Sequence, residues 1–180
     1  MWPSFSLVAL FCLAAPAAHW DNLQLPGGLG RRQVVEYYAG EPRTGVPLGG
    51  LGTGAIELTS EGRFAASTVQ YSYRPGPELL QAGLGVWARS PWRTGASWLQ
   101  VPAPEGLRGP ADLRFFGHWP FAELEPRGAG LPVRVHVTAW TPVIPRRPEL
   151  SAVPALLLRV YLTNPGPAAC DAAVALSWPN

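Results

Sequence analysis

The stretch Pro132–Thr141, with the sequence PVRVHVTAWT, decides the fold class because its apolar and polar side chains alternate one by one. One side of the stretch carries the apolar residues Val133, Val135, Val137 and Ala139. The other side carries Arg134, His136, Thr138 and Trp140. Successive side chains of a β-strand point to opposite faces of a sheet, so this period of two predicts a strand with one buried face.

The same alternation recurs along the chain and predicts about nine short strands. One hairpin is expected from Gly54–Thr59 and Phe64–Tyr71, and a second from 156–163 and 170–178 around the turn Asn164-Pro165-Gly166. The remaining strands are expected at Leu84–Arg89, Trp98–Val101, Leu113–Phe116 and Phe121–Glu125. Because no segment has a helical period over eleven residues, the fold class predicted is all-β, an antiparallel β-sandwich.

Composition supports one folded domain. The 180 residues are 47% apolar and only 14% charged, which argues against disorder. The 20 glycines and 21 prolines fall between the apolar runs, where turns are expected. A formal net charge of +2 without a basic cluster is too small to imply a nucleic-acid partner, so none is expected.

Residues 1–18 differ from the rest of the chain. Phe5–Ala15 is uncharged and apolar, and Ala15-Pro16-Ala17 resembles a signal-peptidase site. The segment is too short to span a membrane. It predicts a signal peptide and export to the periplasm or the extracellular space, and the alternative is a non-targeting N-terminus on a cytoplasmic protein. Residues 19–44 are then a linker or N-terminal arm, and residues 45–180 form the sandwich domain.

The most unusual segment is the glycine run Gly45–Gly54, GVPLGGLGTG. A phosphate-binding loop would end in Lys followed by Ser or Thr, and a dinucleotide fingerprint would lie between a strand and a helix. The run meets neither condition, because an alternating strand follows it. It predicts a tight chain path in which glycine permits positive φ and close backbone packing.

Glycoside hydrolysis is one reaction that a pair of carboxylates could perform, since it uses two of them across a sugar. Glu123 and Glu125 are two residues apart, so on a strand they share one face. The favoured interpretation is a solvated strand face. Glu57 and Asp112 also fall in or near strands without a catalytic partner. The sequence therefore predicts no catalytic residue.

Metal and cofactor sites are not predicted either. The histidines and cysteines, which are the usual soft and borderline metal ligands, are widely scattered at His19, His118, His136, Cys12 and Cys170. Cys170 is expected to be a small buried thiol. A further set of aromatic side chains is expected to fill the core, with stacking on sugars as the alternative: Tyr71, Tyr73, Trp87, Trp92, Trp98 and Trp119.

Two groups of segments resemble family 116 of the glycoside hydrolases, the β-glucosidases and non-lysosomal glucosylceramidases. The glycine run is similar to that family's G-[IV]-P-[LV]-G-G-[IL]-G-x-G. The second group comprises Gly117–Glu125, with the sequence GHWPFAELE, then Ala139–Pro145, with the sequence AWTPVIP, then Asn164-Pro165-Gly166 and Leu176-Ser177-Trp178. The order and spacing agree with the family from Gly45 to Asn180.

The resemblance implies a two-domain enzyme whose N-terminal domain is a β-sandwich. Its C-terminal (α/α)6 domain carries the catalytic carboxylates and performs retaining hydrolysis of β-glycosides. No segment here resembles that second domain, so the chain is expected to stop before it and to be inactive alone. The expected role is a non-catalytic scaffold, with the C-terminal domain as its partner and a β-glycoside bound near the domain interface. The alternative is a stand-alone carbohydrate-binding or structural module.

Overall fold

The computed structural model describes residues 36–38, 45–69 and 82–178, and nearly all of its regular structure is antiparallel β-sheet. The predicted all-β fold class is thereby confirmed. The predicted leader at residues 1–18 lies outside the described residues, as do His19, Tyr71 and Tyr73. In the described part of the chain, no helix combines the length and apolar character needed to cross a membrane.

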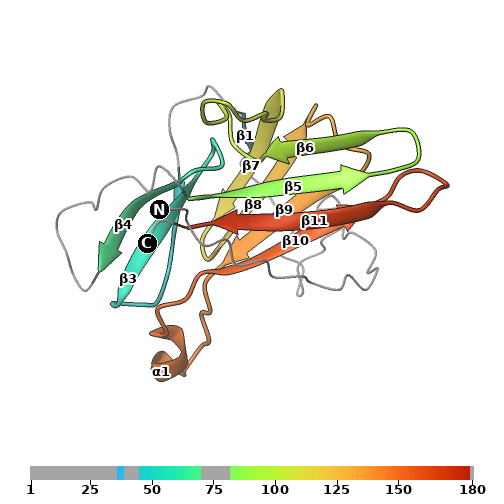
Figure 1. Cartoon of the computed structure of the whole chain (residues 1–180). Helices are drawn as coiled ribbons and strands as arrows, with labels where there is room; N and C mark the ends of the chain where they lie inside the picture. Colours follow the sequence, from blue (N-terminus) through green and yellow to red (C-terminus); the bar gives the residue numbers. More distant parts are fainter. Residues whose placement is uncertain (1–35, 39–44, 70–81, 179–180) are drawn as a thin grey trace, which may run out of the picture.

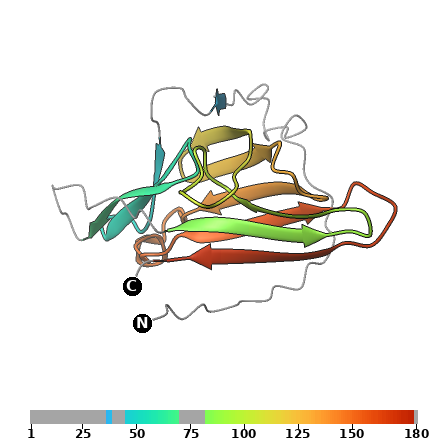
Figure 2. The same ribbon diagram turned by 45° about the horizontal axis from the view of Figure 1, so that its top comes forward.

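Two sheets stack face to face to form the sandwich (Figures 1 and 2). The five-stranded sheet has the order β1 (Glu36–Tyr38), β7 (Asp112–His118), β8 (Phe121–Arg127), β9 (Arg134–Trp140) and β10 (Leu157–Thr163). The opposing sheet has the order β11 (Asp171–Ser177), β5 (Gly83–Arg89) and β6 (Thr94–Trp98). A third sheet at one end has the order β2 (Gly45–Leu48), β3 (Gly54–Thr59) and β4 (Phe64–Val69).

The core lies between the two larger sheets and follows the predicted alternation. On β9 and just before it, the four apolar residues of the predicted buried face are all buried, whereas His136, Thr138 and Trp140 are only half-buried on the opposite face. The other sheet contributes Leu84, Val86 and Ala88. β7 and β8 add Leu113, Phe115, Ala122 and Leu124. Burial of these apolar side chains is the main source of stability for such a sandwich.

The small sheet confirms the first predicted hairpin. β3 pairs with β4, and the turn between them contains Gly62 at a φ of +77°, a conformation that favours glycine. β2 was not predicted as a strand because it contains Pro47. It lies at the edge of the sheet, where a missing backbone N–H is tolerated.

The second predicted hairpin is wrong. β10 pairs with β9, and β11 pairs with β5, so the two strands belong to opposite sheets. The Asn164 side chain accepts a hydrogen bond from Gly166 N at 3.0 Å and donates one to Ala168 O at 2.6 Å. These bonds shape a connection that carries the chain across the sandwich instead of folding it back on β10.

The strand predicted at Trp98–Val101 is misplaced, because the observed strand begins four residues earlier, at Thr94. A tight turn in which Ser90 N donates to Arg93 O at 2.7 Å brings Thr94 opposite Arg89. β6 therefore occupies Thr94–Trp98 and ends where the prediction began.

Between β9 and β10 the chain leaves the sandwich over residues 141–156, here called the excursion, which contains the short helix α1 (Pro148–Ser151). It packs against the glycine run. Leu51 N donates to Ser151 O at 2.8 Å, and the Thr53 hydroxyl donates to Ala152 O at 3.0 Å. The Thr141 hydroxyl also donates to Gly49 O.

Candidate functional site

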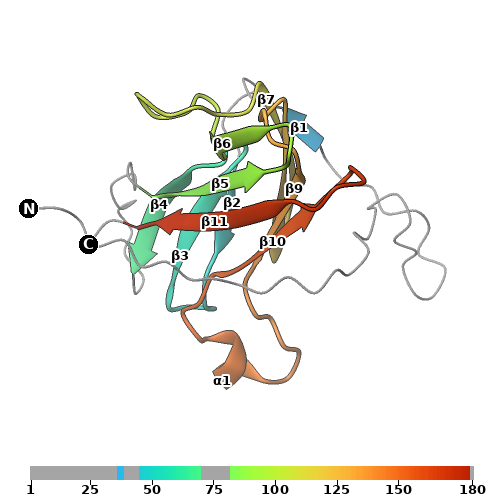
Figure 3. The ribbon, with the colours of Figure 1, turned by 45° about the vertical axis from the view of Figure 1, so that its right-hand side comes forward.

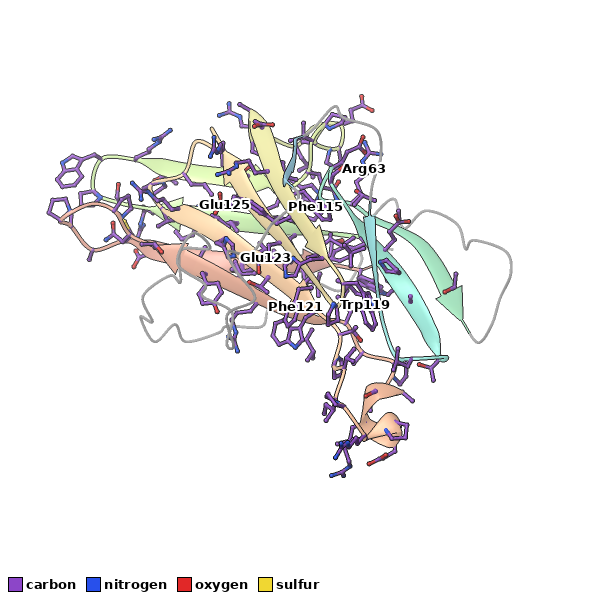
Figure 4. The ribbon with its side chains drawn as sticks, turned by 180° about the vertical axis from the view of Figure 1, so that it is seen from behind. Arg63, Phe115, Trp119, Phe121, Glu123 and Glu125 are labelled. Carbon is purple, nitrogen blue, oxygen red and sulfur yellow. The ribbon has the colours of Figure 1, made fainter. Side chains whose placement is uncertain are left out.

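Glu123 and Glu125 do share the outer face of the five-stranded sheet, and one imidazole connects them. His136 Nε2 lies 3.1 Å from Glu123 Oε2, and His136 Nδ1 lies 3.6 Å from Glu125 Oε1. Arg114 on the neighbouring strand β7 lies 3.2 Å from Glu125. These four residues are called the sheet-face cluster, and Figure 4 shows its two carboxylates along β8.

The interpretation of a solvated strand face is wrong for Glu123, because only 1% of this residue is exposed. Its cross-strand neighbours are Phe116 on β7, which is itself buried, and Thr138 on β9. Glu125, nearer the strand end, is half-buried. A carboxylate in the middle of a sheet loses water even on the outer face, so it needs a cationic partner.

The cluster supplies that partner. Burial lowers the pKa of His136, but the hydrogen bonds that its imidazole donates to Glu123 and Glu125 outweigh burial and raise the pKa to about 9. The hydrogen bond from His136 lowers the pKa of Glu125 against the opposing effect of burial, and the charge of Arg114 lowers it further. At neutral pH His136 is therefore an imidazolium between the two glutamates, and the guanidinium of Arg114 also faces Glu125.

This arrangement is poorly suited to acid–base catalysis on a sugar. A glycosidase acid must hold a proton near neutral pH, which requires a raised pKa. Glu125 has a lowered pKa, and Glu123 is buried with its carboxylate against His136. Both groups already serve an internal ion-pair network.

A hollow of about 980 Å³ opens on the same face. Its walls combine the sheet-face cluster with the aromatic side chains of Phe121 and Tyr161 and the guanidinium of Arg134. Mixed aromatic and charged walls can bind polar ligands. Among the described residues, no group of three or more His, Cys, Asp or Glu side chains is arranged to hold a metal ion.

One end of the sandwich exposes large apolar side chains from three segments, and we call it the apolar end. Its members are Leu51 of the glycine run, Trp119 and Phe121 at the β7–β8 turn, and Ile144, Leu150 and Val153 of the excursion. Thr141 N donates to Pro120 O at 3.1 Å, which joins the turn to the excursion. In Figure 4, Trp119 and Phe121 lie at the end of the sheet from which the excursion extends.

The expectation that the tryptophans fill the core is wrong for Trp87, Trp92 and Trp119, which are exposed. Trp98 is half-buried and packs beside Gly83 and Gly85. Trp87 lies on the outer face of β5, and a strand sequence does not by itself say which of its two faces is covered. Trp92 and Trp119 lie at turns between strands.

The other candidate residues remain apart from the cluster. Glu57 lies on β3 opposite Pro47, and Asp112 begins β7 opposite Arg127. Cys170 is a half-buried free thiol against the core.

Sequence reasoning missed His136 and Arg114 as partners of the two glutamates. The signal was present in the period of two, which places His136 on the polar face, but strand order was needed to bring β7, β8 and β9 together.

The comparisons with known proteins agree with the sequence motifs. Residues 45–180 match the family model described as beta-glucosidase 2, glycosyl-hydrolase family 116 N-term. No curated protein matches the chain.

Proposed function

We propose a function from the premise that this chain belongs to glycosyl-hydrolase family 116, whose N-terminal domain it matches. The chain is the non-catalytic scaffold of a retaining β-glucosidase-like or glucosylceramidase-like enzyme. Its partner is a C-terminal (α/α)6 catalytic domain of the same polypeptide, and the substrate is a β-glycoside bound near the interface of the two domains.

The charge balance of the sheet-face cluster is the observation that carries the non-catalytic role. Glu123 and Glu125 are both engaged by His136, and Arg114 also binds Glu125. A catalytic nucleophile or general acid must instead have a carboxyl oxygen that can reach the substrate. The cluster thus supports the sheet, and the chemistry belongs to another domain.

The apolar end supports a docking role. Exposed apolar patches rimmed by polar residues mark interfaces in folded proteins. β10 runs away from the excursion and β11 returns toward it, so β11 ends at Ser177 on that side of the molecule (Figure 3). The described part of the polypeptide therefore ends on the side of the molecule where the apolar end lies.

Hydrolysis of an aryl β-glucoside tests the proposal. We expect no turnover by the 180-residue chain alone. In the whole enzyme, Glu123→Gln and Glu125→Gln should each keep kcat per folded molecule within about tenfold, whereas loss of a catalytic acid or base costs about 10²–10⁴-fold.

Two results would overturn the scaffold role. One is hydrolysis by the chain alone that disappears in the Glu123→Gln or Glu125→Gln variant. The other is a loss of about 10²-fold or more in a whole-enzyme variant whose circular dichroism spectrum and melting temperature are unchanged.

A carbohydrate-binding module is the second candidate, favoured by exposed Trp119 and by the aromatic walls of the hollow. Stacking of an aromatic ring on a sugar would quench or shift tryptophan fluorescence. Saturable binding of soluble glucans that is lost in Trp119→Ala but kept in Trp92→Ala would favour this module over a pure scaffold.

A further inference from the structure

The hollow on the outer sheet face gathers arginines that are far apart in the sequence. Arg127 ends β8, Arg134 begins β9, and Arg93 lies in the turn between β5 and β6. Arg93 reaches the β8–β9 turn, because its Nη2 would lie 3.9 Å from a Cβ added to Gly130. All three arginines are exposed and line the hollow. We call this part of the hollow the arginine end.

The guanidinium groups of the arginine end are available to a ligand. Within the described residues, no carboxylate forms an ion pair with Arg93, Arg127 or Arg134. Asp112 lies opposite Arg127 across the β7–β8 pairing, but it does not line the hollow. A guanidinium that holds no carboxylate of its own protein can bind an anion from solution through two parallel hydrogen bonds.

The lining of the hollow carries an excess of positive charge. Besides the arginine end it contains Arg114 and His136, whose pKa of about 9 keeps it protonated at neutral pH. These five cationic groups face two carboxylates, Glu123 and Glu125. Because the whole chain has a formal net charge of only +2, this excess is local to the hollow. Such a distribution favours an anionic ligand.

An aromatic ring lies beside these charges. Tyr161 on β10 is the cross-strand neighbour of His136, and the two ring centroids lie 5.9 Å apart. Arg159 Nη1 donates a hydrogen bond to the Tyr161 hydroxyl oxygen at 3.1 Å, so two neighbours hold the ring in place. The hydroxyl groups of Thr138 and Thr163 also line the hollow. A fixed aromatic ring with hydroxyl groups around it suits the apolar face and the hydroxyls of a sugar.

We propose that the hollow binds an acidic saccharide, whose carboxylate pairs with the arginine end and whose sugar ring lies against Tyr161. A carboxylate suits the hollow better than a phosphate, because Glu123 and Glu125 repel a second negative charge on the ligand. The volume of about 980 Å³ is large for a small-molecule site, so the hollow has room for more than one sugar ring.

This inference goes beyond the proposed function. The scaffold role requires no ligand on this face of the sheet, and a module for neutral glucans requires no arginine. The ligand-binding test below therefore does not depend on catalytic activity.

Isothermal titration calorimetry of the 180-residue chain with two matched disaccharides tests the inference. Cellobiouronic acid differs from cellobiose by one carboxylate in place of a hydroxymethyl group. We expect the acid to bind at least about tenfold more tightly than cellobiose at low ionic strength. The difference should shrink as salt is added, because salt screens exposed charges.

Three arginine variants locate the binding site. Arg127→Gln and Arg134→Gln should each weaken binding of cellobiouronic acid by about tenfold and leave the affinity for cellobiose unchanged. Both side chains are exposed, so the fold should be kept, and circular dichroism checks this. Arg108→Gln is the matched control. It removes the same charge from an exposed loop residue that does not line the hollow, and it should change neither affinity.

Four results would overturn the inference. Undetectable binding of cellobiouronic acid, or equal affinity for the two disaccharides, would show that the hollow does not recognise a carboxylate. A loss in Arg108→Gln as large as in the other two variants would show that binding responds only to net charge. Tighter binding of cellobiose phosphorylated at the same carbon would assign the arginine end to phosphate. Hydrolysis of an aryl β-glucoside reports separately on the scaffold role.

Discussion

At the residue scale, His136 determines the charge state of the outer sheet face. Two carboxylates on one strand face would repel each other, and the imidazolium between them converts this repulsion into two attractions. Its pKa of about 9 keeps it protonated at neutral pH. A group whose pKa is higher in the folded state stabilises the fold below its unfolded-state pKa and loses that effect as pH rises through the folded value.

The stability of the chain should therefore depend on pH in a defined way. The contribution of His136 is complete below its ordinary pKa of 6.5 and disappears as pH rises through about 9. Glu125, whose pKa is lowered, contributes fully above its ordinary 4.5 and loses this contribution on acidification below that value. Urea unfolding at a series of pH values should show the greatest unfolding free energy between pH 4.5 and 6.5. The unfolding free energy should fall by roughly 1–3 kcal/mol toward pH 9.

His136→Gln should remove the alkaline decline and lower the unfolding free energy at pH 6 by about 2–4 kcal/mol, since it leaves two carboxylates without their shared cation. Arg134→Gln, an exposed change on the same strand, should stay within about 0.5 kcal/mol and keep the decline. An unchanged alkaline decline in His136→Gln would show that other groups cause it.

At the scale of elements, the excursion packs directly on the glycine run. A Cβ on Gly50 would lie 2.5 Å from Ala152 O and 2.7 Å from Val153 O. Only glycine allows these two backbones to approach so closely. The run therefore fixes where the excursion, and with it half of the apolar end, meets the sandwich.

Gly50→Ala should force the two segments apart and lower the melting temperature by roughly 3–10 °C. Its Cβ would meet the Thr53 hydroxyl first and then two backbone oxygens, which cannot yield without moving the chain. Gly166→Ala is the matched control. The nearest atom to its added Cβ would be Asn164 Oδ1 at 3.5 Å, which is ordinary contact. Thermal unfolding followed by circular dichroism compares the two variants, and equal melting temperatures would contradict this role of the glycine run.

The elements also show what a sequence can predict. β9 and the β3–β4 hairpin were predictable because alternation and a turn signal are local. The partners of β10 and β11 were not, since the Asn164-Pro165-Gly166 turn is compatible with a return within one sheet or a crossing to the other. Burial of Glu123 likewise depends on strands β7 and β9, which no pattern within β8 reveals. Local alternation in the sequence thus predicted these strands, whereas the surroundings of Glu123 depend on pairing between strands that are distant in the sequence.

At the scale of the whole molecule, exposed large apolar side chains from three separate segments gather at the apolar end. The remainder of the described surface has an ordinary character, with isolated exposed aromatics such as Trp87 and Trp92. In the scaffold role proposed above, the apolar end is the surface that would hold the catalytic partner. This surface is formed by turns and by the short helix α1.

Charge placed on the apolar end tests its docking role in the whole enzyme. Ile144 and Leu150 are exposed in this chain, so Ile144→Arg and Leu150→Arg should change the unfolding free energy of the chain alone by less than about 0.5 kcal/mol. In the whole enzyme each arginine would be buried against the catalytic domain without a partner, at a cost of roughly 2–4 kcal/mol. The temperature at which aryl β-glucosidase activity is half lost should then fall. Trp92→Arg, at the β5–β6 turn, should leave it unchanged. If all three variants lose activity at the same temperature as the unmodified enzyme, the catalytic domain does not dock there, because no interface of that kind accepts an unpaired guanidinium without loss of stability.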